Sequence, residues 1–257
     1  MRSTPLRLVP LLALLAALPA FLVAQTLPTR GFSVIADDEQ SRPVEVRLYR
    51  KMAAVVIGID RYQNARHNLK YAVRDAEGME KVLSEQYGFD PVYTLYDEDA
   101  TRDSILELLQ TTLRNTTTQE DAVLVFFSGH GDTIEGTGGP VGYLVPHDGD
   151  FGQPHRNISM ETLRGDVSRL IPARHVFFVV DACYSGILAT RGGEQETSRN
   201  VDYLRSVSDK PARQVLTAGM ADEQVLDGGP LGFGVFTGRV VEALQTASDY
   251  VTARELA

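Results

Sequence analysis

Two stretches of this 257-residue chain place a side chain of catalytic type just after an apolar run. The run 176–180 leads into Cys183, the only cysteine of the chain, and the run 122–127 leads into His130. Consecutive bulky apolar residues are typical of strands buried on both faces in a parallel sheet. If the two strands are parallel neighbours, the thiol and the imidazole face each other where the carboxyl ends of the strands meet.

A thiol and an imidazole in one crevice can cleave an amide bond. The thiolate is the nucleophile, and the histidine takes the thiol proton and later delivers a proton to the leaving amine. The glycines that flank His130 allow the backbone to approach a substrate closely. Backbone N–H groups of Gly131 and Cys183 can stabilise the tetrahedral oxyanion. The pattern therefore predicts hydrolysis through a thioester.

Two other interpretations of Cys183 are weaker. A lone cysteine is often a small buried hydrophobic residue, but several polar or turn-forming neighbours argue against a place in mid-core: Asp181, Tyr184, Ser185 and Gly186. A phosphatase-type site needs a Cys-x5-Arg loop to hold phosphate. Arg191 is eight residues after Cys183, so that spacing fails.

The two motifs together resemble the caspase superfamily of cysteine peptidases. Ser-Gly-His-Gly at 128–131 is followed about 50 residues later by Asp-Ala-Cys-Tyr-Ser-Gly at 181–186, and this order and spacing match caspases. The caspase signature has Gln where this chain has Asp181, and Asp-x-Cys-x-Ser-Gly is similar to metacaspases and their bacterial relatives. The resemblance runs from about Met52 to the end of the chain. It implies an endopeptidase with Cys183 as nucleophile and His130 as general base and acid.

The alternative within this superfamily is a catalytically silent binding or scaffold module. Such proteins keep the fold and lose the cysteine or the histidine. This chain keeps both, together with the glycines around the histidine, so we expect a hydrolase, a thiol protease. Labelling of the active site distinguishes the two classes.

Charge predicts the preferred substrate. Asp181 lies two residues before the nucleophile, and a carboxylate in a partly desolvated crevice favours a cationic side chain. We therefore expect protein or peptide substrates cleaved after Arg or Lys. The resemblance implies a pocket formed by Asp75, Ser128 and Asp181, although Ala72 stands where many metacaspases have Cys. Without the resemblance, Asp75 would be interpreted as a solvated helical acid.

Calcium is the cofactor that the resemblance raises, because many metacaspases need it. Asp148 stands where one ligand is expected, but the other expected acids appear as Met160-Glu161 and Thr190. Calcium needs several oxygen ligands, so we expect no cofactor, with calcium as the alternative. A zinc site is a weaker interpretation, because no ligand spacing recurs among the nearby candidates: His147, Asp148, Asp150 and His155.

Alternating apolar patterns predict the fold. They indicate strands and helices in turn, from the amino end: strand 52–59, helix 69–87, strand 91–95, helix 101–113, strand 122–127, a hairpin element at 142–146, a helix from Ser159 to before Pro172, strand 176–180, strand 214–218 and helix 236–247. This order predicts an α/β fold, a caspase-like three-layer αβα sandwich with a mostly parallel central sheet.

The chain divides into segments of different character. Residues 25–50 are a polar leader with a possible edge strand at Val44–Leu48, and 51–257 form the peptidase domain. Within it we expect a large segment 51–186, a linker 187–212 and a small segment 213–257. Caspase relatives are often zymogens that cut themselves in this linker; the candidate sites are Arg191, Arg199, Arg205 and Lys210. An uncut surface loop is the alternative. The last residues resemble the beginning of an element, so we expect the protein to continue.

Residues 1–24 have the pattern of a secretory signal peptide. A basic start with Arg2 and Arg7 precedes a short apolar stretch, and cleavage is expected after Ala24. An uncleaved anchor is less favoured because Pro10 and Pro19 interrupt the stretch. We therefore expect a secreted or periplasmic protein without stable membrane insertion. The net charge of −9 argues against nucleic acid as a partner.

Overall fold

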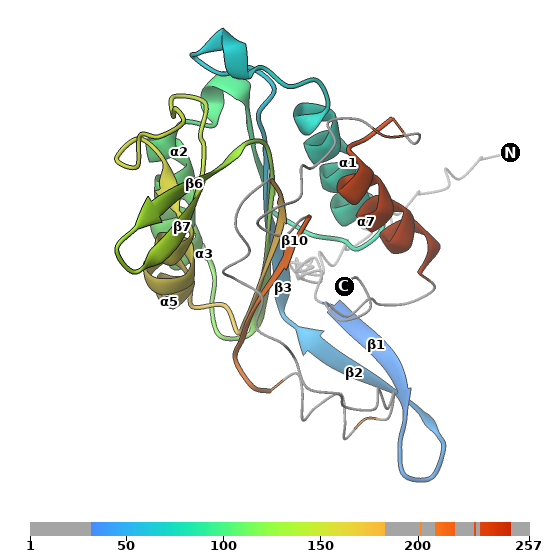
Figure 1. Cartoon of the computed structure of the whole chain (residues 1–257). Helices are drawn as coiled ribbons and strands as arrows, with labels where there is room; N and C mark the ends of the chain where they lie inside the picture. The colour runs from blue at the N-terminus through green and yellow to red at the C-terminus, as the bar shows by residue number, and fades with distance from the viewer. Residues whose placement is uncertain (1–31, 183–200, 202–208, 219–228, 230–231, 248–257) are drawn as a thin grey trace, which may run out of the picture.

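The structure is a computed structural model that describes residues 32–182, 201, 209–218, 229 and 232–247 (Figure 1). Several expectations fall on residues outside these ranges: the signal peptide 1–24, the nucleophile Cys183 and most of the linker 187–212. The expected general base His130, the expected oxyanion donor Gly131 and the three expected pocket residues lie within them.

A parallel sheet forms the centre of the described part of the chain. Its strand order is β10-β9-β5-β3-β4, with bounds β3 (Lys51–Gly58), β4 (Val92–Tyr96), β5 (Asp121–Ser128), β9 (His175–Asp181) and β10 (Ala212–Thr217). The middle strands β3, β5 and β9 are buried almost throughout. Because both of their faces are covered, they carry apolar residues at consecutive positions. The two apolar runs before His130 and Cys183 are therefore parallel neighbours, which is the condition that a shared site requires.

Helices cover both faces of this sheet (Figure 1). On one face lie α1 (Ala72–Glu85) and α7 (Val235–Thr246); on the other lie α2 (Arg102–Glu107), α3 (Leu113–Thr116), α4 (Met160–Thr162) and α5 (Ser168–Leu170). Short 3-10 turns occur at Ala65–His67 and Asp97–Asp99, and π-helical turns at Leu108–Thr112 and Leu163–Val167. Each face has its own hydrophobic cluster. The three-layer αβα sandwich is thus confirmed, and no helix in the described ranges is long and apolar enough to cross a membrane.

Side-chain caps begin the two helical segments on the α2 face. The Thr101 hydroxyl accepts a hydrogen bond from the Ser104 N–H (3.2 Å), and the Ser159 hydroxyl accepts one from the Thr162 N–H (3.0 Å). The helix expected over 101–113 is α2, a π-helical turn and α3 in succession. The π-helical turns do not alter the apolar face, since Ile105, Leu109 and Leu113 are all buried.

A small antiparallel sheet follows β5. It pairs β6 (Gly131–Gly136) with β7 (Gly139–Leu144), and β7 with β8 (Ile158–Ser159). The hairpin element expected at 142–146 is therefore the second half of a longer hairpin. Because β6 begins at Gly131, it ties the residues directly after His130 to the body of the domain.

A hairpin precedes the central sheet. β1 (Phe32–Asp37) and β2 (Pro43–Tyr49) form an antiparallel pair of their own, and Figure 1 shows it projecting from the lower end of the sandwich. The alternation at Val44–Leu48 does mark a strand, but its partner is β1, not the edge of the central sheet. The leader interpretation of 25–50 is thus incomplete. The expectation missed β1 because Ile35, at 69% exposure, obscures the alternation of buried Val34 and Ala36.

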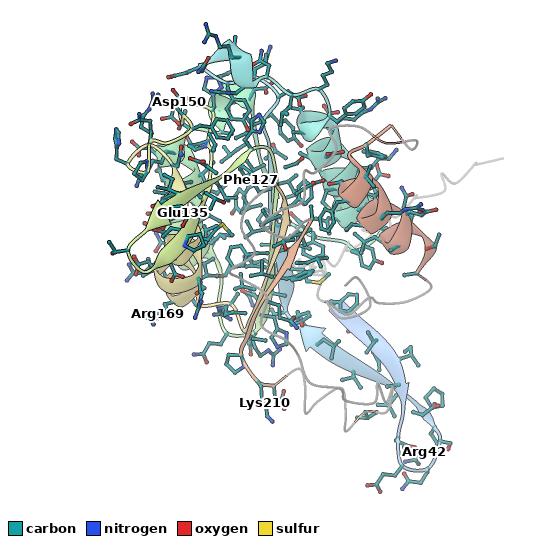
Figure 2. The ribbon with its side chains drawn as sticks, viewed as in Figure 1. Arg42, Phe127, Glu135, Asp150, Arg169 and Lys210 are labelled. Carbon is teal, nitrogen blue, oxygen red and sulfur yellow. The ribbon has the colours of Figure 1, made fainter. Side chains whose placement is uncertain are left out.

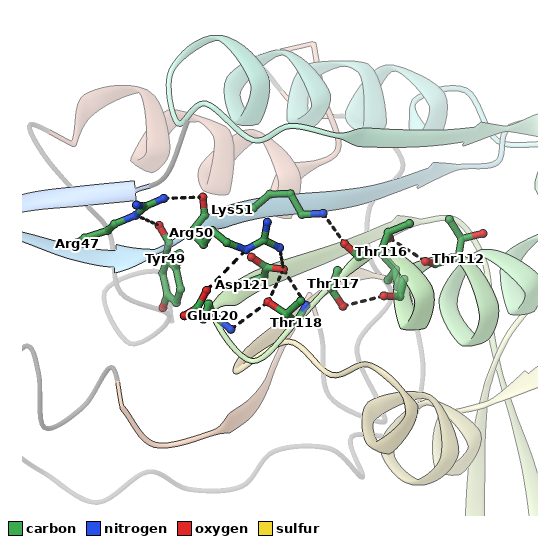
Figure 3. A network of polar contacts seen from close by, with 11 residues as sticks. Arg47, Tyr49, Arg50, Lys51, Thr112, Thr116, Thr117, Thr118, Glu120 and Asp121 are labelled. Atoms are coloured by element: carbon green, nitrogen blue, oxygen red, sulfur yellow. Dashed lines mark hydrogen bonds and ion pairs between the residues drawn. The ribbon is translucent and has the colours of Figure 1, made fainter. Parts of the chain in front are cut away.

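A polar network fixes the junction of this hairpin with the amino end of the sheet (Figure 3). Asp121, the first residue of β5, is completely buried and forms a salt bridge of 2.7 Å with Arg50. The Thr118 N–H donates to the same carboxylate (2.7 Å), and Lys51 Nζ donates to the Thr116 carbonyl (2.5 Å). This end of the sheet is held by ion pairs, and the candidate catalytic residues lie at the other end.

Candidate active site

The carboxyl ends of β3, β5 and β9 meet at one edge. Strand register pairs Gly58 with Ser128 and Ser128 with Asp181. His130 follows the end of β5 by two residues, one fewer than expected, because β5 continues through Ser128. Cys183 follows the end of β9 by the same two residues in the sequence, although its own position lies outside the described residues.

The imidazole of His130 is oriented by a backbone carbonyl. Its Nε2 lies 2.8 Å from the carbonyl oxygen of His67. A carbonyl oxygen only accepts hydrogen bonds, so Nε2 carries the proton and donates it. In a neutral imidazole the lone pair is then on Nδ1. Nδ1 is therefore the atom of His130 that can act as a base.

The backbone of His130 is fixed by Tyr62. The His130 N–H donates to the Tyr62 hydroxyl at 2.8 Å, and the two rings lie 5.1 Å apart. A Cβ on Gly129 would lie 2.8 Å from the same hydroxyl oxygen, so only glycine allows this approach. Burial raises the pKa of Tyr62 well above its usual value, which keeps the phenol neutral. Residue 129 is thus a glycine for a steric reason that the sequence motif alone does not show.

His67 is held in turn by its neighbours. Its Nε2 lies 3.0 Å from Asp150 Oδ1, and the ring of Phe151 packs against both His67 (4.6 Å between centroids) and His130 (5.2 Å). Sequence reasoning missed Tyr62, His67 and Phe151. His67 acts on His130 through its backbone carbonyl, and such a role leaves no signature in the side-chain types of the sequence. The only available signal was that residue 67 is itself a histidine.

The strand pairing agrees with a donor role for Gly131. The Val145 N–H donates to the His130 carbonyl at 3.0 Å. Gly131 and Leu144 are therefore a non-hydrogen-bonded pair of the β6–β7 ladder, in which the N–H of each residue points away from the partner strand. This orientation is the one that an oxyanion donor requires.

The three expected pocket residues converge on one buried point. The Ser128 hydroxyl donates to Asp75 Oδ2 at 3.2 Å, and Ser128 is the register partner of Asp181. All three are nearly inaccessible, with exposures of 2% for Asp75, 3% for Ser128 and 4% for Asp181. Asp75 is in the first turn of α1 and is not a solvated helical acid.

The first turn of α7 closes this point from the other side. The Gly234 N–H donates to Asp75 Oδ1 (2.8 Å). The Thr237 hydroxyl (2.5 Å) and N–H (3.2 Å) both donate to Asp181 Oδ2. Burial raises the pKa of Asp75 to about 7; the Gly234 N–H opposes this shift and the negative charge of Asp181 adds to it. Asp75 therefore changes charge near neutral pH.

The residues named for calcium or zinc are not arranged as a metal site in the described part of the chain, where no group of three or more His, Cys, Asp or Glu side chains is placed to hold an ion. Asp148 Oδ1 instead accepts the Arg102 N–H at the start of α2 (2.8 Å). His147 Nδ1 donates to the Arg61 carbonyl (2.6 Å).

Of the four candidate cleavage sites, only Lys210 is described. Its carbonyl accepts a hydrogen bond from His175 Nε2 (2.8 Å), and Ala212 after it already begins β10. Figure 2 shows Lys210 at the end of the sandwich opposite Asp150, which adjoins His67. Arg191, Arg199 and Arg205 lie outside the described residues.

Comparison with known proteins gives a family and a fold. The family profile described as "Caspase domain" matches residues 51–256. Among solved structures, protein GSU0716 from Geobacter sulfurreducens is similar with a TM-score of 0.56 and 19% identity, over 80% of this chain and 86% of that one. Caspase-1 from Spodoptera frugiperda is similar with a TM-score of 0.53 and 14% identity, over 80% and 73% of the two chains. No curated protein matched. The profile spans most of the chain, so the protein belongs to the caspase domain family, within the cysteine peptidase superfamily.

Proposed function

We propose that this protein is a cysteine endopeptidase that cleaves peptide bonds after Arg or Lys through His130 and Cys183. The observation that carries the proposal is the joint arrangement at the carboxyl edge of the sheet. One imidazole there has a fixed Nε2–H and a basic Nδ1, and two buried carboxylates lie at the ends of the adjacent elements. Family membership supports peptide hydrolysis, and the buried acids support the choice of substrate.

The chemistry follows from these groups. His130 Nδ1 takes the Cys183 thiol proton, and the thiolate attacks the carbonyl carbon of the scissile bond. The N–H groups of Gly131 and Cys183 stabilise the oxyanion. The intermediate collapses to a thioester as His130 protonates the leaving amine. His130 then deprotonates a water molecule, which attacks the thioester and releases the acid product and the thiolate.

Specificity rests on the charge of the acid cluster. Asp75 and Asp181 come from different elements, α1 and β9, and are both almost completely buried. A cationic side chain that reaches them would offset the cost of two like charges in a low-dielectric site. An acidic substrate side chain would increase that cost, which argues against cleavage after Asp.

We further propose export after cleavage at Ala24 and activity without a metal cofactor. Self-processing in 187–212, if it occurs, is expected at Arg191, Arg199 or Arg205. Lys210 is a poor candidate because His175 already binds its carbonyl and Pro211 follows it.

The test is hydrolysis by the purified mature chain. Matched fluorogenic peptides ending in Arg, Lys or Asp are compared with and without calcium, beside Cys183→Ala. We expect cleavage of the Arg and Lys peptides that is lost in Cys183→Ala and changes less than about twofold with calcium or a chelator. Cleavage that survives in Cys183→Ala would sink the assignment. A chain that cleaves nothing although its linker 187–212 is cut would be a binding module, and an inactive chain with an intact linker would be a zymogen or a binding module.

A further inference from the structure

Helix α7 contributes polar groups to the acid cluster. Thr237 is completely buried on the inner face of α7, beside Val240, Val241 and Leu244. A buried hydroxyl among apolar residues needs a partner, and Thr237 finds it in Asp181 Oδ2 at 2.5 Å. The Thr237 N–H binds the same oxygen at 3.2 Å. Two donors from one residue therefore fix the position of this carboxylate oxygen.

Capping of a helix is the simpler explanation of these contacts, since a carboxylate at a helix N-terminus is favourable. One carboxylate would suffice for that purpose. Here a second one, Asp75, reaches the Gly234 N–H of the same turn from α1. Among the described residues no Lys or Arg forms an ion pair with Asp75. The second acid makes capping more costly, so capping alone does not explain the pair.

Asp181 connects three parts of the site. Its side chain is bound by α7, and its backbone carbonyl accepts the Gly129 N–H at 3.2 Å, next to His130. In the sequence it precedes Cys183 by two residues. Helix α7 therefore holds the carboxylate of Asp181. Gly129, next to His130, holds its backbone.

We infer that Thr237 is a positioning residue for substrate recognition: its hydroxyl holds the Asp181 carboxylate in the orientation that receives a basic substrate side chain. The inference rests on the proposed function and extends its pocket to the first turn of α7. The acids supply the charge, and α7 supplies the geometry.

The lack of space for a side chain at Gly234 agrees with this role. A Cβ at this position would lie 2.8 Å from Asp75 Oδ2 and 3.2 Å from Asp181 Oδ2. Only a glycine lets the α7 backbone approach both carboxylates at once. The absence of a side chain at Gly234 therefore allows the first turn of α7 to lie close to both carboxylates. This position of α7 places the Thr237 hydroxyl within hydrogen-bond distance of Asp181.

The test compares Thr237→Val, Thr237→Ser and Thr117→Val with the wild-type chain. Thr117 is the matched control, since its buried hydroxyl also makes one hydrogen bond, to the Leu113 carbonyl at 2.7 Å, in the network at the amino end of the sheet (Figure 3). The substrates are two peptides that differ only in Arg against citrulline, its uncharged analogue, at the cleavage position. The readout is the ratio of the two kcat/KM values, in which a general loss of folded enzyme cancels.

We expect Thr237→Val to reduce this ratio by about fivefold or more, since a hydrogen bond to a charged group is lost, and to raise KM for the Arg peptide. Thr237→Ser should restore the ratio, and Thr117→Val should leave it unchanged even if it lowers the melting temperature. If Thr237→Val does not fold, Thr237→Ala carries the same expectation.

An unchanged ratio in Thr237→Val, including the case in which both kcat/KM values fall equally, would overturn the inference and leave the proposed function intact. A wild-type chain that cleaves neither peptide would overturn both. The two failures are thus distinguishable in one experiment.

Discussion

The buried carboxylates at the two ends of the central sheet have different kinds of partner. At the amino end, Asp121 begins β5 with no exposure and is neutralised by Arg50 at 2.7 Å. At the carboxyl end of the same strand, Ser128 binds Asp75, whose partners in the described part of the chain are a hydroxyl and a backbone N–H. The first carboxylate is part of the fold, since its charge is paired within the chain. The difference supports the proposal that the second end binds a cationic side chain of the substrate.

The pKa of Asp75 expresses this difference. Burial without a neighbouring cation raises the pKa of a carboxylate, and burial raises the pKa of Asp75 to about 7. The acid cluster therefore costs stability that Asp121 does not, which natural proteins accept mainly at functional sites.

The largest expected effect separates the two ends by matched substitutions. Asp181→Asn should lower the Arg-to-citrulline ratio of kcat/KM by about 10- to 100-fold, because a charge-assisted contact with the substrate is lost. Asp121→Asn should leave that ratio unchanged and lower the free energy of unfolding by about 1–3 kcal/mol, because the buried carboxylate that binds Arg50 and the Thr118 N–H is lost. Peptide kinetics and urea unfolding measure the two effects. Exchanged results, with Asp121→Asn altering the ratio, would break the comparison.

A smaller effect concerns pH. The Arg-to-citrulline ratio should rise by about tenfold between about pH 6 and about pH 8, as Asp75 ionises, while titration of His130 and Cys183 cancels in the ratio. Asp75→Asn should abolish the rise. A ratio that stays flat in the wild type would remove Asp75 from the pocket.

The same group should change stability with a defined sign. The folded state keeps the Asp75 proton up to a pKa of about 7, and the unfolded state keeps it only up to the ordinary pKa of 3.8. Raising the pH between these values therefore disfavours folding, and the contribution is constant above them. The melting temperature of the wild type relative to Asp75→Asn should fall across this window and not rise.

The smallest effect tests the approach of α7. Gly234→Ala should reduce the Arg-to-citrulline ratio several-fold and destabilise the fold by about 1–3 kcal/mol, since the added Cβ crowds both carboxylates. Gly165→Ala is the control, because a Cβ there meets no atom within 4 Å. Equal behaviour of the two variants in kinetics and melting would mean that the crowding is relieved by a harmless shift.

The sequence predicted the middle of the fold better than its edges. β3, β5 and β9 are buried almost throughout, and consecutive apolar residues mark them clearly. β1 was missed because its exposed face carries Ile35, so burial and residue type disagree there. Asp75, Ser128 and Asp181 were named from motifs, and the structure brings them together.

The polar groups that orient His130 and Asp181 were not predictable in the same way. His67 acts through its backbone carbonyl, and Tyr62 through a hydroxyl that accepts from the His130 backbone. Thr237 is 56 positions from Asp181 in the chain, and no local pattern links the two. Such contacts depend on the packing of whole elements, which only the folded structure specifies.

The most direct test of the central claim is covalent labelling at residue 183. A peptidyl chloromethyl ketone ending in Arg is compared with the same reagent ending in citrulline, and the adduct is located by mass spectrometry, which is unambiguous because the chain has a single cysteine. The account predicts that Cys183 is alkylated, and at least about 10-fold faster by the Arg reagent. Equal rates for the two reagents, or no adduct on Cys183 in the folded mature chain, would contradict it.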